Sequence, residues 1–349
     1  MDTRVVRIDA NNMDHKALKR AGALIREGGL VAFPTETVYG LGANGLDAGA
    51  VKGIFKAKGR PSDNPLILHI SRTEELDRLV ACVPAAASKL IDRFWPGPLT
   101  LVLKKSPLVP EAVTAGLDTV AVRMPSHPIA ARMIYYAGVP VAAPSANLSG
   151  KPSPTRISHV LDDLMGRVDM IIDGGDVSVG LESTVAEVTP GGVSVLRPGG
   201  ITVEQIRQVV GNVFVDPALE NGNGTDIPRS PGMKYTHYSP EAEVIIIDGI
   251  IERVVGRIQR MSGELEAKGR KVGILATEQT RALYRNGTVI SAGDREKPCT
   301  IAASLFAALR EFDRLGVDII LAEAVERDDM GLAIMNRLLK AASYNIIRV

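Results

Sequence analysis

The chain has 349 residues, 45% of them hydrophobic, and its 41 basic and 40 acidic side chains leave a formal net charge of +1. This length predicts about two domains with sizeable cores. The near-zero charge excludes an overall field that attracts nucleic acid or membranes, so any anion site must be local. Cys82 and Cys299 lie far apart in no metal-ligand spacing, no signal-peptide pattern is present, and no apolar run could cross a bilayer. We therefore expect a soluble, cytoplasmic protein.

The first two hundred residues alternate between helical and strand-like patterns, which predicts an α/β domain over residues 1–212 with a mixed sheet. Helices are predicted over residues 14–29, 48–59, 73–81, 128–138, 157–166 and 202–210. Thr73 is expected to cap the third of these helices, residues 73–81. Strands are predicted over residues 30–34, 65–70, 99–104, 119–125, 139–144, 169–175, 183–189 and 193–199.

The alternation lapses in the middle of the chain and then resumes. Residues 213–241 are rich in Pro, Gly and Asn, which is typical of a linker or an active-site lid. Residues 242–349 alternate strand and helix three times, as βαβαβα. This pattern predicts a smaller, Rossmann-like C-terminal domain.

Polar side chains follow several predicted strands of the first domain, where ligands usually bind in α/β sheets. Any one such cluster is most often a helix cap, but here several occur together with a basic turn at residues 56–60. Arginine matches phosphate and carboxylate groups with two parallel hydrogen bonds. The pattern therefore favours a ligand that carries phosphates and a carboxylate. The clusters contain Thr35, Glu36, Thr37, Arg123, Ser145, Asn147, Ser153 and Arg197.

The segment "GLGANG" at residues 40–45 matches the glycine spacing of a dinucleotide-binding loop. Such a loop should follow its strand directly, and the next strand should end in Asp or Glu. Neither condition holds, so we expect no nicotinamide or flavin site. The chain also lacks the P-loop, zinc-protease and nucleophile-elbow motifs, which argues against those mechanisms.

Seven strings in the first domain resemble, in order, those of the YrdC-like L-threonylcarbamoyladenylate synthases. They are "FPTETVYGLG", "KGRPSDNPLILHI", "FWPGPLTLVL", "VAVRMPSHP", "PSANLSGKPSPT", "ESTV" and "LRPGGIT". The segments "SPGMKYTHYSP" and "GLAIMNRLLKAA" are similar to the long, two-domain form of that family. The resemblance implies a YrdC-like α/β domain with a twisted mixed sheet and a large concave cleft.

The resemblance also implies a reaction. L-threonine and bicarbonate form a carbamate, which reacts at the α-phosphate of ATP to give threonylcarbamoyl-AMP and pyrophosphate. Downstream transfer proteins then place the threonylcarbamoyl group on tRNA beside the anticodon. Mg²⁺ is expected to accompany ATP without a ligand from the protein. No membrane partner and no direct tRNA binding are expected.

The matching positions imply the site residues. Lys58 and Arg60 are expected to act in catalysis by neutralising the triphosphate. Trp95 is expected to have a structural role. Lys56 is expected to be a solvated helix residue that does not bind the ligand. The L-threonine contacts are expected to be Thr35, His69, Arg123, the backbone at Ala143, and Ser183. The ATP contacts are expected to be Lys58, Arg60, Asn64, Thr119, Ser145, Ser153, Arg197, Tyr235 and Tyr238.

Two further points remain open. We expect the linker to close over the nucleotide as a lid, with Tyr235 or Tyr238 at the phosphates. One alternative function is an RNA-binding module that uses a basic concave face, although the net charge weakens that interpretation. The other alternative is a carbamoyl-transfer domain of the kind found in hydrogenase maturation. The chain has no acylphosphatase-like or zinc-finger segment to accompany such a domain.

Overall fold

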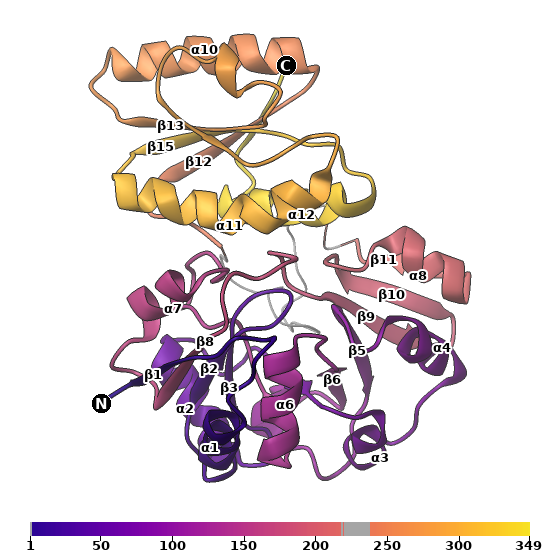
Figure 1. Ribbon diagram of the computed structural model, residues 1–349. Coiled ribbons are helices and arrows are strands. Elements are labelled where there is room, and N and C mark those ends of the chain that lie inside the picture. Colours follow the sequence, from indigo (N-terminus) through magenta and orange to yellow (C-terminus); the bar gives the residue numbers. More distant parts are fainter. Residues whose placement is uncertain (1, 218, 220–237) are drawn as a thin grey trace. The chain divides into compact units, whose positions relative to one another are not determined.

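A computed structural model describes residues 2–217, 219 and 238–349 and divides the chain into two compact units (Figure 1). The first unit comprises Met1–Ser149 and Ser153–Tyr235, and the second comprises Gly150–Pro152 and Thr236–Val349.

The short segment 150–152 belongs to the second unit because hydrogen bonds tie it there. The Ser239 amide donates to the Gly150 carbonyl oxygen at 2.9 Å. The Arg310 side chain donates to the Pro152 carbonyl oxygen from Nε at 3.0 Å and from Nη2 at 2.7 Å. The sequence-based prediction placed residues 150–152 in the first domain, residues 1–212. It could not assign them to the second unit, because these hydrogen bonds join positions far apart in the sequence.

The described part of the first unit forms an eleven-stranded mixed sheet, which confirms the predicted fold class. The strand order is β1-β8-β2-β3-β7-β4-β6-β5-β9-β10-β11. The strands are β1 (Arg4–Arg7), β2 (Val31–Phe33), β3 (Gly40–Asn44), β4 (Ile67–His69), β5 (Leu99–Lys104), β6 (Thr119–Arg123), β7 (Val141–Ala142), β8 (Met170–Asp173), β9 (Thr184–Thr189), β10 (Gly192–Arg197) and β11 (Val213–Val215). The helices are α1 (His15–Arg26), α2 (Ala48–Lys58), α3 (Leu76–Leu79), α4 (Ala85–Phe94), α5 (Glu111–Thr114), α6 (Pro128–Ala137), α7 (Ile157–Leu164) and α8 (Val203–Val210).

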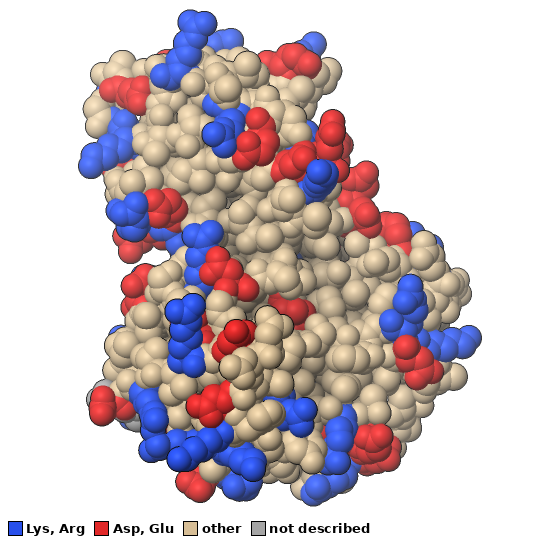
Figure 2. Space-filling view, in the orientation of Figure 1, with Lys and Arg blue, Asp and Glu red and all other residues tan. Residues whose placement is uncertain are grey.

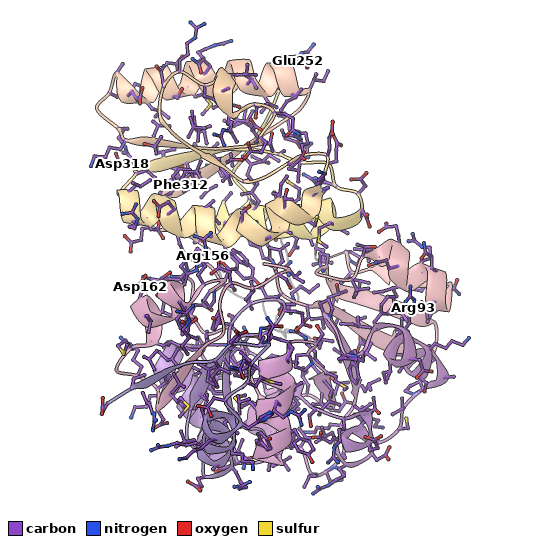
Figure 3. All side chains as sticks on the ribbon, in the orientation of Figure 1. Arg93, Arg156, Asp162, Glu252, Phe312 and Asp318 are labelled. Atoms are coloured by element: carbon purple, nitrogen blue, oxygen red, sulfur yellow. The ribbon has the colours of Figure 1, made fainter. Side chains whose placement is uncertain are left out.

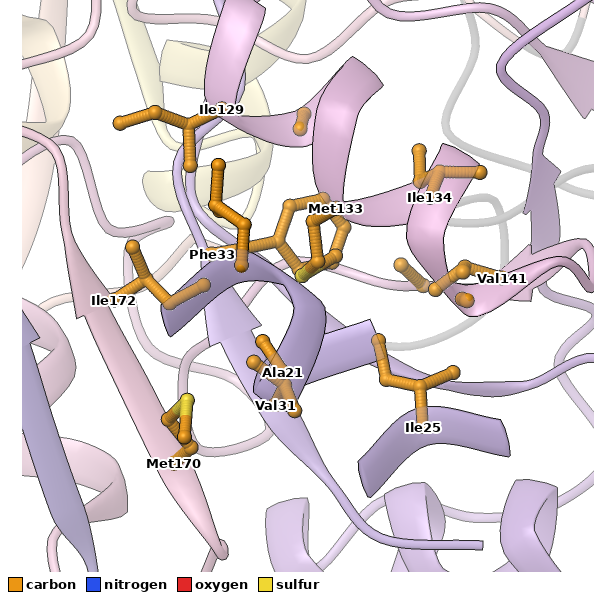
Figure 4. Packing of buried hydrophobic residues seen from close by; sticks show 14 of the residues in the cluster. Ala21, Ile25, Val31, Phe33, Ile129, Met133, Ile134, Val141, Met170 and Ile172 are labelled. Atoms are coloured by element: carbon orange, nitrogen blue, oxygen red, sulfur yellow. The ribbon is translucent and has the colours of Figure 1, made fainter. Parts of the chain in front are cut away.

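In the first unit, α1 and α6 pack side by side and bury apolar faces in a cluster with β2 and β8 (Figure 4). Phe33 and Met133 lie at the centre of this cluster and are fully buried. Gly22 permits the close helix crossing, because a Cβ atom there would lie 2.6 Å from the Ala137 nitrogen. A larger side chain at this position would force the two helices apart.

The segment "GLGANG" is a strand and its end rather than a phosphate-binding loop. Gly40–Asn44 forms β3, which pairs antiparallel with both β2 and β7. A Cβ atom at Gly42 would lie 2.7 Å from Val141 Cγ1, and one at Gly45 would lie 2.5 Å from Leu68 Cδ2. These glycines therefore serve close packing inside the sheet.

The predicted third helix differs from the structure at its start. Residues Thr73–Glu75 form a 3-10 turn, and α3 covers only Leu76–Leu79. The Glu75 carboxylate, rather than the Thr73 side chain, accepts the Ser71 and Arg72 amides at 3.1 and 3.0 Å. The prediction of Thr73 as the cap was therefore wrong, because a glutamate can reach back to satisfy these donors.

The first sheet also extends past residue 212, where the sequence placed the start of the linker. Val213–Val215 forms β11, which pairs in parallel with β10. Only three residues long and exposed at Phe214, this edge strand has no strong pattern of its own. The hydrogen bonds to β10 rather than local propensity hold it in the sheet.

The second unit is a parallel sheet between two helical layers (Figure 1). Its strand order is β14-β13-β15-β12-β16, and every neighbouring pair is parallel. In Figure 3, Phe312 points from α11 towards the sheet, where Gly273 leaves room for its ring. The elements are β12 (Glu243–Asp248), α10 (Ile251–Glu266), β13 (Val272–Ala276), β14 (Thr288–Ser291), α11 (Pro298–Leu315), β15 (Ile319–Glu323), α12 (Asp329–Ala341) and β16 (Ile346–Arg348).

The predicted βαβαβα pattern captured the three central strands of this unit and missed its two edges. Both β14 and β16 are short and only partly buried, so they carry no continuous apolar run. Over the residues that the structure describes, no helix is long and apolar enough to span a membrane.

Candidate active site

A row of polar side chains crosses neighbouring strands of the first sheet. In the strand register, His69 of β4 lies beside Arg123 of β6, and Arg123 lies beside Thr100 of β5. The Thr100 Oγ1 atom is 2.8 Å from the Ser183 Oγ atom, just before β9. Arg197, at the end of β10, donates to the Ser183 carbonyl oxygen at 3.0 and 3.2 Å. The sheet therefore brings four of the predicted site residues into one continuous row with Thr100.

Arg123 is the most heavily engaged member of this row. Its Nη2 atom lies 2.7 Å from Glu36 Oε1, and both side chains are buried. Its Nη1 atom donates to Thr37 Oγ1 at 2.9 Å, and its Nε atom donates to the Gly97 carbonyl oxygen at 3.3 Å. A buried guanidinium with these partners is held rigidly at the carboxyl end of β6.

Glu36 is the acid that balances this arginine. Burial raises the pKa of the Glu36 carboxyl, but the Arg123 charge and hydrogen bonds from Arg123 and from backbone groups outweigh it, so the pKa is lowered overall. The pair is therefore ionised near neutral pH. From the sequence, Glu36 had no assigned role and Arg123 was expected to bind the carboxylate of L-threonine. A ligand carboxylate at Arg123 would have to share the guanidinium with Glu36.

Thr35 belongs to the tight turn that follows β2. Its Oγ1 atom donates to the Val38 carbonyl oxygen at 2.6 Å and lies 2.8 Å from Thr37 Oγ1. Because Thr37 bonds Arg123, the buried Thr35 joins the polar row through one intermediate side chain. Its hydroxyl shapes the turn in this structure, and its contact with L-threonine stays a prediction.

His69 is a buried, neutral histidine at the end of β4. Burial, with the nearby Arg123 charge, lowers the pKa of its imidazole to about 3. The Nδ1 atom lies 3.2 Å from the Ile67 carbonyl oxygen, and the ring meets the Phe33 ring edge-on. A neutral ring in this position can accept or donate a hydrogen bond without adding charge.

This lowered pKa makes stability depend on pH in a defined direction. Between pH 7 and 5 the unfolded chain takes up a proton at His69 and the folded chain does not, so acidification should destabilise the fold. In the His69→Asn variant this contribution is absent, and the slope of unfolding free energy against pH should fall by up to about 1.4 kcal/mol per pH unit. Urea unfolding at several pH values measures both slopes. Equal slopes would show that His69 titrates normally in the fold.

A second polar group surrounds Lys58, the last residue of α2. The Lys58 Nζ atom donates to the carbonyl oxygens of Ser145 and Asn147, each at 2.5 Å. The Ser145 hydroxyl in turn donates to Asn147 Oδ1 at 2.5 Å. Gly59 ends the helix in a left-handed conformation, which aims Lys58 at this loop. The structure thus brings the two predicted ATP contacts Lys58 and Ser145 together, while Lys56 is exposed on the same helix. Their binding of ATP stays a prediction.

Two further predicted residues lie inside the first unit in different settings. Ser153 is fully buried and donates to Glu182 Oε1 at 2.5 Å, next to Ser183 in the chain. The Ala143 amide donates to the Ile67 carbonyl oxygen at 2.9 Å, so its N–H is already used within the sheet. Glu182 was not singled out from the sequence, where it reads as an ordinary acid in the "ESTV" string.

The turn after α2 holds Arg60 and Asn64. Arg60 Nη2 contacts the carbonyl oxygens of Asn64 and Pro65 at 3.5 and 3.4 Å, which braces the turn. Asn64 is fully buried, and neither end of its side-chain amide has a hydrogen-bond partner among the residues that the structure describes. Buried polar groups without partners are rare in folded proteins. The Asn64 amide is therefore a strong candidate for a ligand contact.

Replacing Asn64 by leucine, which has a similar volume, should separate stability from function. Removing an unpaired buried amide should raise the unfolding free energy by about 1–3 kcal/mol. The same change should weaken ATP binding, measured by calorimetry. The exposed Asn12, changed to leucine, is the control and should leave ATP binding unchanged. Lower stability or unaltered ATP affinity in Asn64→Leu would contradict the assignment.

Thr119 and Arg123 lie at opposite ends of β6 on the same face, because side chains alternate along a strand. Between them lies Ala121, which packs in a buried apolar cluster. The face therefore has polar groups at each end and an apolar floor about 13 Å long, from the rise of a strand over four residues. The floor consists of Ile67, Val102, Ala121, Val185 and Leu196.

Of the two linker tyrosines, Tyr238 belongs to the described residues. Tyr235 and most of the proposed lid lie outside the described residues. Tyr238 belongs to the second unit, where its buried ring stacks on Phe306 with 5.2 Å between centroids and lies 5.6 Å from the Arg337 guanidinium. This packing gives Tyr238 a structural role there, and its contact with nucleotide stays a prediction.

The described residues contain no group of three or more His, Cys, Asp or Glu side chains placed to hold a metal ion. The buried donors of this unit are instead amides, hydroxyls and cations. Such groups suit the oxygens of a phosphate or a carboxylate rather than a bare metal ion.

An α/β sheet with cationic and hydroxyl side chains at two ends of one face, joined to a parallel-sheet domain, defines the class of two-domain YrdC-like proteins. A family model described as "Telomere recombination", for Sua5, YciO and YrdC, matches residues 23–199. A second model, "Threonylcarbamoyl-AMP synthase, C-terminal domain", matches residues 201–343. The chain belongs to the Sua5 family of threonylcarbamoyl-AMP synthases, in its long two-domain form.

Relatives of known name match almost the whole chain. The threonylcarbamoyl-AMP synthase of Pyrococcus abyssi is 52% identical over 95% of this chain and 96% of the relative. That of Bacillus subtilis is 52% identical over 95% of this chain and 94% of the relative. The crystal structure of P. abyssi Sua5 complexed with L-threonine has a TM-score of 0.95 and 50% identity, covering 99% of this chain and 100% of that one. These matches confirm the predicted family and fold.

Proposed function

We infer that this chain makes threonylcarbamoyl-AMP from L-threonine, bicarbonate and ATP, releasing pyrophosphate, for the threonylcarbamoyladenosine modification of tRNA. The observation that carries this function is the single face of the first sheet, polar at both ends and apolar between them. A bisubstrate reaction needs two polar ends for two reactants and a surface on which they meet. The relatives that match almost the whole chain are named threonylcarbamoyl-AMP synthase, which supports the same activity.

The carboxyl ends of β4 and β6 form the amino-acid end of the proposed site. Arg123 offers the charge for the threonine carboxylate, and His69 offers a neutral hydrogen-bonding ring beside it. Because Glu36 already balances Arg123, the bound carboxylate adds to an ion pair instead of meeting an isolated cation. Ser183 and Thr35 complete this end.

The turn after α2 and the loop after β7 form the nucleotide end. Asn64 supplies a buried amide without a partner among the described residues, and Arg60 supplies positive charge next to it. Lys58 supplies a second cation at the loop after β7. The carbamate oxygen bonds to the α-phosphorus of ATP while the bond from that phosphorus to the pyrophosphate oxygen breaks. Charge moves onto the leaving pyrophosphate, and lysine and arginine at that position stabilise it. Ser145, Ser153 and Thr119 are the further proposed nucleotide contacts. Arg197, also expected to contact ATP, bonds Ser183 and so lies beside the amino-acid end, where the two reactants would meet.

Magnesium enters this proposal only with the nucleotide. The phosphates and water can supply most ligands of Mg²⁺, so the proposal assigns the ion no ligand from the protein. When bound, the ion would neutralise phosphate charge. The residues of this chain then position the two reactants and exclude water between them.

The test is pyrophosphate release by the purified full-length chain with ATP, Mg²⁺, L-threonine and bicarbonate. Release should require threonine, and labelled bicarbonate should appear in a product that contains AMP and threonine. L-serine in place of L-threonine is the control for the amino-acid end. Pyrophosphate release that is independent of threonine, or no release at all, would reject the proposed function.

A further inference from the structure

A groove in the second unit is lined mainly by arginine. It lies between α10 and the edge strand β16 and has a volume of about 470 Å³. Its location in Figure 1 is beside the C-terminus. The residues that line it are Arg253, Gly256, Arg257, Arg260, Ile347, Arg348 and Val349. Nothing in the proposed synthesis of threonylcarbamoyl-AMP uses these side chains.

The pattern of α10 explains why its three arginines line one groove. Arg253, Arg257 and Arg260 follow the spacing i, i+4, i+7, which places side chains on one face of a helix. The buried residues Val254 and Ile258 occupy the other face, against the sheet. Gly256 leaves the space between the arginines open, because a Cβ atom there would meet nothing within 4 Å.

The four arginines have little opposing charge. No acidic side chain lines the groove, although Val349, the last residue of the sequence, adds a backbone carboxylate to the lining. None of the four arginines forms an ion pair with a side chain that the structure describes. Asp248 lies beside Arg348 in the strand register, but its carboxylate pairs with Arg327 at 3.7 Å. Glu252 lies on α10 itself, labelled in Figure 3, and is also outside the lining.

Four cations around one groove repel one another, and a bound polyanion would relieve that repulsion. Figure 2 shows Lys and Arg side chains projecting on the α10 side of this unit. Guanidinium groups match phosphate oxygens with paired hydrogen bonds. The lining has no aromatic ring on which a base could stack, so the groove suits a charged backbone rather than a particular sequence.

We propose that this groove binds the phosphodiester backbone of RNA, and that tRNA is the RNA concerned. The choice of tRNA rests on the proposed function, because the threonylcarbamoyl group is destined for tRNA. Binding the acceptor through the second unit leaves the face of the first sheet available for ATP and threonine. This proposal replaces the expectation that the chain shows no direct tRNA binding. That expectation was based on the formal net charge of +1, which gives no information about where the arginines cluster.

The test uses the full chain and a fluorescently labelled, unmodified tRNA transcript, with binding followed by anisotropy at several salt concentrations. Wild-type affinity should fall steeply with salt, because bound phosphates release counterions. In the double variant Arg253→Glu, Arg257→Glu the affinity should fall at least tenfold, and the slope of log affinity against log salt should decrease by about 2. Threonine-dependent pyrophosphate release should be unchanged, which also verifies folding and separates this proposal from the proposed function.

The control double variant Lys268→Glu, Arg285→Glu makes the same change in total charge at exposed positions outside the groove. It should retain most of the affinity for tRNA. If the groove variant and the control variant lost the same affinity for tRNA, the effect would come from net charge alone, and the proposal would be overturned. Binding of tRNA that is independent of the groove arginines would also overturn it. Stronger arginine-dependent binding to vesicles of anionic lipid than to tRNA would overturn the assignment of the ligand to RNA.

Discussion

Replacing Arg123 by alanine should abolish threonine-dependent pyrophosphate release and also destabilise the fold. Arg123 balances the buried Glu36 carboxylate at 2.7 Å and bonds Thr37 and the Gly97 carbonyl group. Removing one partner of a buried ion pair leaves the other charge uncompensated, at a cost of about 3–5 kcal/mol. Chemical unfolding measures the stability, and the pyrophosphate assay over a range of threonine concentrations measures the loss of function.

A second substitution separates the two effects. In the double variant Arg123→Ala, Glu36→Gln no buried charge is left unpaired, so much of the lost stability should return. Activity should not return, because the cation for the threonine carboxylate is still missing. The idea would be refuted if the double variant recovered activity, or if Arg123→Ala bound and used threonine as well as the wild type.

Replacing Lys58 by methionine should lower the rate of pyrophosphate release by about two orders of magnitude or more, as is typical when a preorganised electrostatic contact is removed. The ammonium group of Lys58 holds two carbonyl oxygens of the loop at residues 145–147, both at 2.5 Å. Methionine keeps the apolar stem of the side chain but offers neither the charge nor the donors. Steady-state kinetics with varied ATP measure the change.

Lys56→Met is the matched control, because Lys56 lies two residues earlier on the same helix and is exposed. It should leave both the rate and the KM for ATP unchanged. If the two variants behaved alike, the effect would come from the general charge of the helix end. A wild-type rate in Lys58→Met would remove this lysine from the catalytic residues.

Much of the fold could be read from local patterns. Asp47 caps α2 through the Gly49 and Ala50 amides, and Gly59 ends that helix in a left-handed conformation. These are short-range effects of side chain on backbone, and they recur wherever the same residues occur. The edge strands β11, β14 and β16 could not be read this way, because short strands gain their stability from a neighbour across the sheet.

The site was predicted unevenly for a similar reason. Lys58 and Ser145 do lie together, and His69, Arg123, Ser183 and Arg197 fall in one row of the sheet. Glu36, Thr37, Thr100 and Glu182 had no assigned role, yet each bonds a predicted site residue. The only advance signal for Glu36 and Thr37 was their place beside Thr35 after a buried strand. Their partners could not be named without the register of the strands.

The sequence by itself determined the family and most of the helices and strands that alternate along the chain, and it supplied the candidate residues of the site, because these depend on motifs and on local spacing. Only the tertiary structure decided that His69, Arg123 and Thr100 are neighbours, and that Glu36 neutralises Arg123. The physical reason is that strand register is set by hydrogen bonds and side-chain packing between segments many residues apart. A slip of one residue would turn Arg123 to the other face of the sheet, and no local pattern excludes that slip.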